Sequence, residues 1–190
     1  MNNLVANGLC IRPLVLADAG ALAQAAVESL DTLGLWMPWC DERFGLAEAE
    51  QWVQVCVAEL AARTAYSMGI FAEDDGAYIG SIGINHINRQ HNFANLGFWV
   101  RAAWQNQGVA RRAVPMMADF GLDVLGLDRI EIVIAEHNLA SRRVAEAVGA
   151  RFEGILAKRV ALRGAPTAAA MYSLTRDSGE IITMPTSTTP

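Results

Sequence analysis

The chain has 190 residues, of which 53% are hydrophobic and 18% charged, and its formal net charge is −5 at pH 7. This length and composition predict one folded domain with a substantial core and exclude a disordered chain. The acidic balance, without a basic stripe, excludes a general nucleic-acid binder. No apolar run approaches the roughly 18 residues of a membrane span, and the N-terminus lacks the pattern of a signal peptide. We therefore expect neither nucleic acid nor a membrane as a partner.

The three cysteines, Cys10, Cys40 and Cys56, do not have the spacing of a metal site. They favour buried thiols in a reduced, cytoplasmic setting, and no metal cofactor is expected. The sequence gives no direct sign of self-association, so a homodimer is left open.

The first half of the chain predicts two helices and four strands. Asp18 can cap the first helix, and a Glu-Asp-Asp-Gly turn at 73–76 joins two strands as a hairpin. Residues 31–45, between the helices, are irregular. The predicted elements are a strand at 9–16, helices at 18–30 and 47–63, strands at 66–72, 77–84 and 93–100, and a polar turn at 86–92.

The second half predicts two helices and three further strands. The first of these helices contains Pro115, which removes one backbone hydrogen bond and is expected to kink it. Residues 1–176 are expected to form a single domain, followed by a mobile Ser/Thr/Pro-rich tail at 177–190. The predicted elements are helices at 108–125 and 138–148 and strands at 129–135, 152–162 and 167–175.

These elements add up to an α/β fold with a mixed sheet. It has about seven strands and about four helices, and its first half consists of antiparallel hairpins. The strands at 93–100 and 129–135 each lead into a helix, with a crossover helix between them. We therefore expect these two strands to be parallel.

The connection after the strand at 93–100 carries the pattern Gln-x-x-Gly-x-Ala, from Gln105 to Ala110. A helix follows directly, and the first N–H groups of a helix have no partner within it. With the positive end of the helix dipole and the charges of Arg111 and Arg112, these groups predict a binding site for an anion such as a diphosphate. Many glycine-containing connections bind nothing, so the turn alone is a weak signal.

A second strand, polar turn and helix follow at 131–152, with Asn138-x-x-Ser141 and then Gly149-x-x-Phe152. Together the two segments resemble the GNAT superfamily of acetyl-CoA-dependent N-acetyltransferases. The run Trp36-Met37-Pro38-Trp39 and the closing Tyr172-Ser173-Leu174 narrow the resemblance to the RimJ/RimL-like branch. The similarity covers roughly residues 8–176.

The resemblance implies a GNAT-like fold whose central parallel strands splay apart to admit the arm of acetyl-CoA, the expected co-substrate. It also implies acetyl transfer to a primary amine by direct attack in a ternary complex. The implied cofactor-binding residues are Phe98, Trp99, Val100, Gln105, Asn106, Gln107, Gly108, Val109, Ala110, Arg111 and Asn138.

The reaction needs a proton for the leaving thiolate and a site that accepts the proton of the amine. Related enzymes assign the first role to the serine that matches Ser141. Alternatively, Asn138 simply caps the helix and Ser141 is an ordinary first-turn residue.

Relatives carry a glutamate base at places that here fall on Asn95 or near Val160, and neither residue can accept the proton. The possible substitutes are His137, Glu136 and His86, and we name His137 as the catalytic candidate.

The missing base favours acceptors that lose a proton easily. The pKa is about 7.8 for a terminal α-amine and about 10.4 for a lysine side chain. We therefore expect the α-amine of a protein N-terminus or a small amino compound as the acceptor. The candidate acceptor residues are Trp36, Trp39 and His86, although both tryptophans also suit a role as core anchors.

Two other readings are left open. One is a non-catalytic module or sensor that binds coenzyme A, which the two missing carboxylates motivate. The other is an unrelated α/β domain that binds nucleotides.

Overall fold

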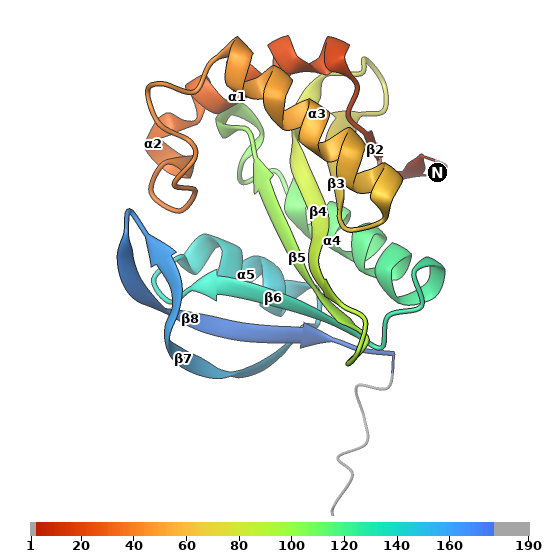
Figure 1. Cartoon of the computed structure of the whole chain (residues 1–190), viewed down its shortest axis with the longest axis vertical. Helices are drawn as coiled ribbons and strands as arrows, with labels where there is room; N and C mark the ends of the chain where they lie inside the picture. The colour runs from red at the N-terminus through yellow and green to blue at the C-terminus, as the bar shows by residue number, and fades with distance from the viewer. Residues whose placement is uncertain (1–2, 177–190) are drawn as a thin grey trace, which may run out of the picture.

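The computed structural model describes residues 3–176, so the predicted tail at 177–190 lies outside the described residues. Within them, eight strands form one mixed sheet in the order β1-β2-β3-β4-β5-β6-β8-β7 (Figure 1). The strands are β1 (Leu4–Ala6), β2 (Leu9–Pro13), β3 (Tyr66–Ala72), β4 (Tyr78–Asn88), β5 (Phe93–Val100), β6 (Arg129–Ala135), β7 (Arg151–Leu162) and β8 (Ala165–Leu174). The predicted α/β fold with a mixed sheet is confirmed.

The strand beyond the expected seven is β1, which pairs with β2 through a tight turn at Asn7 and Gly8. Both turn residues have positive φ, 56° and 73°. An Asn-Gly pair adopts this geometry readily, so the dipeptide was the signal for this hairpin. The strand predicted at 9–16 is shorter in the structure, where β2 ends at Pro13 and a short 3-10 turn follows at Leu16–Asp18.

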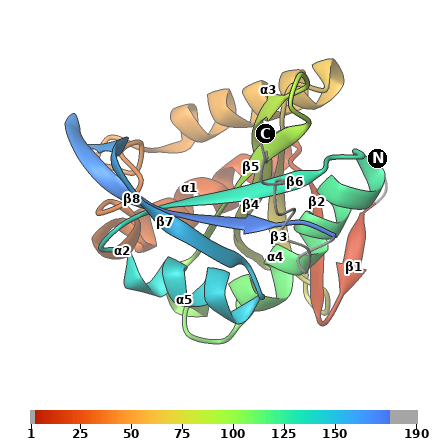
Figure 2. The same cartoon turned by 90° about the horizontal axis from the view of Figure 1, so that it is seen from below.

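Five α-helices cover the sheet in the described part of the chain. They are α1 (Ala19–Glu28), α2 (Leu30–Leu33), α3 (Leu46–Ala62), α4 (Val109–Asp119) and α5 (Leu139–Ala147). Figure 2 shows α3 on one side of the sheet and α5 on the other. None of the helices in residues 3–176 has the length and apolar character needed to cross a membrane.

Two separate cores follow from the alternation of side chains along the strands. On β5, Leu96 belongs to the core that α4 and α5 cover, whereas Trp99 belongs to the core that α1 and α3 cover. Small residues let α1 approach closely, because Ala25 and Ala26 are completely buried there. Each face of β5 therefore meets a different helical layer.

Helix α4 contains Pro115 and continues without interruption to Asp119. A π-helical turn follows at Phe120–Val124, in which the N–H of Leu125 donates to the carbonyl of Phe120 (3.0 Å). The predicted helix at 108–125 is therefore two segments, and the change of helix type comes after the proline rather than at it.

The parallel strands β5 and β6 pair over a short stretch only, from Phe93 opposite Arg129 to Asn95 opposite Glu131. Both strands then continue without pairing to each other, and Figure 1 shows them diverging. At the point of divergence, the side-chain oxygen of Asn95 accepts a hydrogen bond from the N–H of Val133 on β6 (3.4 Å). The expected splayed pair is confirmed.

Candidate functional site

A cavity of about 560 Å³ lies where β5 ends and helices α4 and α5 begin. Four segments line it: the α2 region, the end of β5, the turn before α4 and the first turns of α5. Its walls therefore come from chain segments far apart in sequence. The predicted site residues that line it are Trp36, Phe98, Trp99, Val100, Gln105, Asn106, Gly108, Val109, Ala110, Arg111, Asn138 and Ser141.

The connection between β5 and α4, which we call the glycine turn (residues 101–108), opens its backbone to the cavity. Asn106 and Gly108 have positive φ, 59° and 72°, and a Cβ built on Gly108 would meet no atom within 4 Å. The N–H of Arg112 donates to the carbonyl of Gly108 (3.1 Å), so the helical pattern starts there. The N–H groups of Val109, Ala110 and Arg111 precede that bond and have no acceptor within the helix.

The cationic side chains of the cavity lining suit an anion. Arg111 and Arg143 both line the cavity. Arg112, also expected to add positive charge beside the turn, instead donates from Nη1 to the carbonyl of Asn7 in the β1–β2 turn (2.5 Å). Gln107, a predicted cofactor ligand, is not among the lining residues, and its amide donates to the carbonyl of Ala103 (2.8 Å).

Together these features fit an extended ligand with a diphosphate. Unpaired helix N–H groups, a positive dipole end and two guanidinium groups bind phosphate oxygens well. The adjoining part of the cavity, at Phe98 and Val100, runs along a strand edge that β6 does not pair. Backbone groups on such an edge can bond the amide groups of a slender arm.

At the start of α5, Asn138 caps the helix. Its side-chain oxygen accepts from the N–H of Ser141 (3.1 Å). The side-chain oxygen of Asn138 therefore caps the helix, as the alternative interpretation expected. The side-chain NH₂ group of Asn138 does not take part in the cap and can donate a hydrogen bond. Ser141 lies half-buried in the cavity wall, three residues after the cap.

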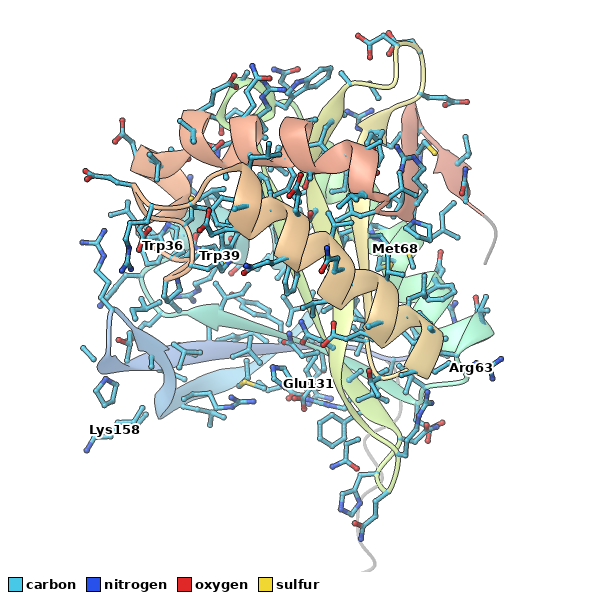
Figure 3. The ribbon with its side chains drawn as sticks, turned by 45° about the horizontal axis from the view of Figure 1, so that its top comes forward. Trp36, Trp39, Arg63, Met68, Glu131 and Lys158 are labelled. Carbon is cyan, nitrogen blue, oxygen red and sulfur yellow. The ribbon has the colours of Figure 1, made fainter. Side chains whose placement is uncertain are left out.

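Helix α2 and the segment after it form another wall of the cavity. Trp36 lines the cavity, whereas Trp39 packs on Phe44 and Trp99, with ring centroids 5.0 and 5.9 Å apart. Figure 3 shows both tryptophans on the segment between α2 and α3. Trp39 is therefore a packing anchor of this segment and not a lining residue. The β7–β8 hairpin also reaches this wall, because Arg163 donates to the carbonyl of Gly34 (3.2 Å).

The structure places both predicted histidines outside the cavity. His137 is exposed in the turn before α5, and His86 is exposed on β4. The predicted turn at 86–92 is shorter than expected, because β4 runs to Asn88 around a bulge where His86 has φ 50°. His86 lies near the start of β5, whereas the cavity lies at the other end of that strand.

Sequence reasoning did not assign several lining residues to the site, because most of them lie outside the motifs. Asp31 is the one carboxylate that lines the cavity in the described part of the chain. The signal that could have indicated Asp31 is its position in the segment 31–45, which also contains Trp36. The other missed lining residues are Thr32, Leu33, Leu35, Met37, Trp104, Ala140, Arg143 and Val144.

Neither of the two positions where relatives carry a glutamate base, Asn95 and Val160, places an ionisable side chain in the cavity. The amide NH₂ of Asn95 donates to the side-chain oxygen of Asn85 (2.9 Å), which leaves a neutral pair at the fork of the sheet. Val160 lies on β7 and is not a lining residue.

Cys40 and Cys56 are buried, and burial raises the pKa of both thiols, that of Cys56 to about 12. Both are protonated at neutral pH and poor nucleophiles.

Comparison with known proteins shows which family has this fold and cavity. Residues 8–151 match the acetyltransferase (GNAT) domain. The chain belongs to this family. The predicted membership is thus confirmed, and acetyl-CoA is the acyl donor of GNAT enzymes.

Relatives of this GNAT protein carry related names. The "Probable N-acetyltransferase YjcK" of Bacillus subtilis is 34% identical over 100 residues, about half of each chain (52% of this one, 55% of YjcK). A structure from Vibrio cholerae, described as a "putative ribosomal-protein-serine acetyltransferase", is 29% identical with a TM-score of 0.81, over 92% of this chain and 97% of that one. RimJ of Mycobacterium smegmatis, solved with a CoA disulfide, shares the fold at 24% identity and a TM-score of 0.82, over 89% and 82%. These names agree with the RimJ/RimL-like resemblance.

Proposed function

We propose that this GNAT protein transfers the acetyl group of acetyl-CoA to the α-amine of a protein N-terminus or of a small amino compound. One observation carries the proposal: a single cavity joins the open helix end at the glycine turn, the unpaired edge of β5 and Ser141 to the segment that holds Trp36. A donor and an acceptor can therefore meet inside one cavity. Such a meeting is what direct transfer requires.

On the donor side, the first N–H groups of α4 and the guanidinium of Arg111 would hold the diphosphate. The end of β5, from Phe98 to Val100, would hold the arm that carries the thioester. The NH₂ group of Asn138 and the guanidinium of Arg143 are further donors on the α5 wall. In this arrangement the thioester would lie between β5 and Ser141.

In the reaction, the amine nitrogen forms a bond to the acetyl carbon and the carbon–sulfur bond breaks. The amine gives up a proton to solvent, and the departing sulfur gains one. The Ser141 hydroxyl can donate a hydrogen bond to that sulfur and so lower the cost of the charge on it. His137 has no part in this proposal because it is exposed outside the cavity.

The acceptor side has one charged side chain among its described lining residues, the carboxylate of Asp31. It can attract an amine while that amine is still an ammonium ion. Asp31 is exposed. An acceptor with a pKa near 7.8 would need about 3.5 kcal/mol less help in losing its proton than a lysine side chain.

The contact between Arg163 and Gly34 brings the β7–β8 hairpin against the segment after α2. Two chain segments thereby meet on the acceptor side of the molecule. This meeting favours an acceptor with a slender reactive end, as both an N-terminal residue and a small amine have.

The test is a binding measurement followed by an acceptor screen. Calorimetry with acetyl-CoA should show binding, and thiol release should follow on a peptide with a free N-terminus. A peptide with a blocked N-terminus and a free lysine is the control and should react much more slowly. Equal turnover of both peptides would contradict the α-amine assignment. Binding without turnover on any amine would favour the coenzyme-A sensor.

A further inference from the structure

Helix α1 and the short helix α2 meet the glycine turn through side chains that lie 73 residues apart in sequence. At the end of α1, the carboxylate of Glu28 accepts two hydrogen bonds from Arg101, from Nε (2.6 Å) and Nη2 (2.7 Å). The pKa of Glu28 is lowered and that of Arg101 is raised, in both cases mainly by this hydrogen-bonded pair. The pair is therefore charged at neutral pH.

The second contact is buried. Ser29 has no exposed surface, and its hydroxyl donates to the carbonyl of Ala25 (2.6 Å). The same oxygen accepts from the N–H of Ala102, the second residue of the glycine turn (2.9 Å). Both hydrogen-bonding roles of the hydroxyl are thus in use. A buried serine that uses both roles fixes the position of the backbone it contacts.

The third contact involves a residue predicted to bind the cofactor. The amide NH₂ of Gln105 donates to the hydroxyl of Thr32 (3.1 Å) and to the carbonyl of Val100 at the end of β5 (2.9 Å). The Thr32 hydroxyl donates in turn to the carbonyl of Ser29 (3.1 Å). With both amide hydrogens of Gln105 used in this way, its side chain acts as a brace across the turn.

The three contacts connect two walls of the same cavity. The glycine turn forms the donor wall, and the residues directly after Ser29, from Asp31 to Met37, form the acceptor wall. A shift in either wall would stretch bonds to the other. Because such coupling is reciprocal, a ligand that orders one wall also favours the ordered form of the other.

We propose that Thr32 and Ser29, with Glu28, are positioning residues that hold the glycine turn in the form that accepts acetyl-CoA and tie it to the acceptor wall. The inference rests on the proposed acetyl transfer. In this role Thr32 acts through Gln105 and Ser29 acts through the backbone of Ala102. Loss of the Thr32 hydroxyl should therefore weaken donor and acceptor binding together, although its exposed position makes it a minor contributor to stability.

The experiment compares Thr32→Val with Thr32→Ser. Valine keeps the shape of the side chain and removes the hydroxyl, whereas serine keeps the hydroxyl. By calorimetry, Thr32→Val should bind acetyl-CoA about 3- to 10-fold more weakly, the effect of losing one hydrogen bond. At saturating acetyl-CoA its KM for the amine should rise by a similar factor with a smaller change in kcat. Thr32→Ser should restore both values.

Thr64→Val is the matched control, because the Thr64 hydroxyl bonds the carbonyl of Glu59 at the far end of α3 (3.4 Å). It should bind acetyl-CoA like the wild type. Circular dichroism should show that every variant is folded. A folded Thr32→Val protein with wild-type affinity and KM would overturn the positioning role. If the wild type itself failed to bind acetyl-CoA, the proposed function would be wrong instead, so the two failures are distinct.

Discussion

At the scale of single residues, the polar groups around the cavity divide into two sets. One set is used within the protein: the amide of Gln105 braces the glycine turn, and the carbonyl oxygen of Asn138 caps α5. The other set faces the cavity and is available to a ligand, and it contains the Ser141 hydroxyl and the Asp31 carboxylate. This division separates residues that shape the site from residues that can take part in binding and chemistry.

The first residue-scale prediction concerns Ser141. Replacing it with alanine should leave acetyl-CoA affinity near the wild-type value, because the diphosphate end of the cavity is unchanged. The rate kcat should fall by about 10-fold, which corresponds to about 1.4 kcal/mol of lost stabilisation of the leaving sulfur. Single-turnover kinetics with an α-amino peptide measures this. Thr64→Ala, at the far end of α3, is the control; full turnover by the Ser141 variant would remove the assignment.

The second concerns Asp31. Changing it to asparagine removes the negative charge from the acceptor wall and keeps the size of the side chain. The KM for a cationic amine should rise by about 3- to 10-fold, as expected for a partly exposed charge pair, while acetyl-CoA affinity should not weaken. Steady-state kinetics at saturating acetyl-CoA tests this. Asp128→Asn, exposed outside the cavity, should behave like the wild type, and an unchanged KM in Asp31→Asn would argue against amine recognition there.

The sequence predicted more of the cavity lining at the glycine turn than at the α1–α2 junction, for a physical reason. Gly108 and the helix that follows form a local motif, so neighbouring residues specify the geometry. Asp31 and Thr32 reach the cavity only because the α1–α2 junction packs against the glycine turn. Contacts over such a separation leave no local pattern in the chain.

At the scale of elements, the end of β5 depends on the glycine at position 80 of β4. Gly80 pairs with Val100, and a Cβ built on Gly80 would collide with the carbonyl oxygen of Trp99. Trp99 and Val100 both line the cavity. The close approach of two strand backbones therefore sets the position of the β5 edge that lines the cavity.

Gly80→Ala should disturb both the fold and the site. The added methyl group forces the strands apart, and such overpacking costs about 1–3 kcal/mol of unfolding free energy. Acetyl-CoA affinity should fall as well, because the end of β5 moves. Urea unfolding and calorimetry measure the two effects. Gly20→Ala is the matched control, since a Cβ there meets no atom within 4 Å and alanine favours the helix, so this variant should gain about 0.5–1 kcal/mol. A Gly80→Ala protein as stable as the wild type would show that the strands tolerate the contact.

Most elements were predictable because their hydrophobic periodicity is strong, as on β5 and β6. The strand β1 was missed because it has three residues, and three residues give no period to detect. The length of β4 was also underestimated, because its bulge places polar Asn85 and His86 inside a strand. Polar residues there were interpreted as the start of a turn.

At the scale of the whole molecule, a charged network joins β6, β8 and β7, the three strands that follow β5 in the order of the sheet. Arg129 on β6 donates to Glu131 on the same strand (3.0 Å) and, through Nη1, to Glu153 on β7 (2.7 Å). Glu153 also accepts from the hydroxyl of Ser173 on β8 (2.8 Å). The sheet order places β8 between β6 and β7, so this network spans it and ties the outer strand to the centre.

This network predicts how stability depends on pH. The hydrogen bond from Arg129 lowers the pKa of Glu153 below its ordinary value of 4.5, with burial opposing and Ser173 assisting. Because the folded pKa is below the unfolded one, the carboxylate stabilises the protein fully above about pH 4.5, and this contribution is lost as the pH falls through the folded pKa.

Glu153→Gln should therefore lose stability at pH 7 and lose less than the wild type on acidification. Since a third of the Glu153 side chain is exposed (32%), solvent screening limits the loss to about 0.5–1 kcal/mol. Urea unfolding at pH 7 and pH 4 should show the wild type and the variant approaching each other at pH 4. Glu73→Gln, in the exposed β3–β4 turn, should run parallel to the wild type at both values. A constant gap between Glu153→Gln and wild type at both pH values would mean that the carboxylate charge does not hold β7 to the sheet.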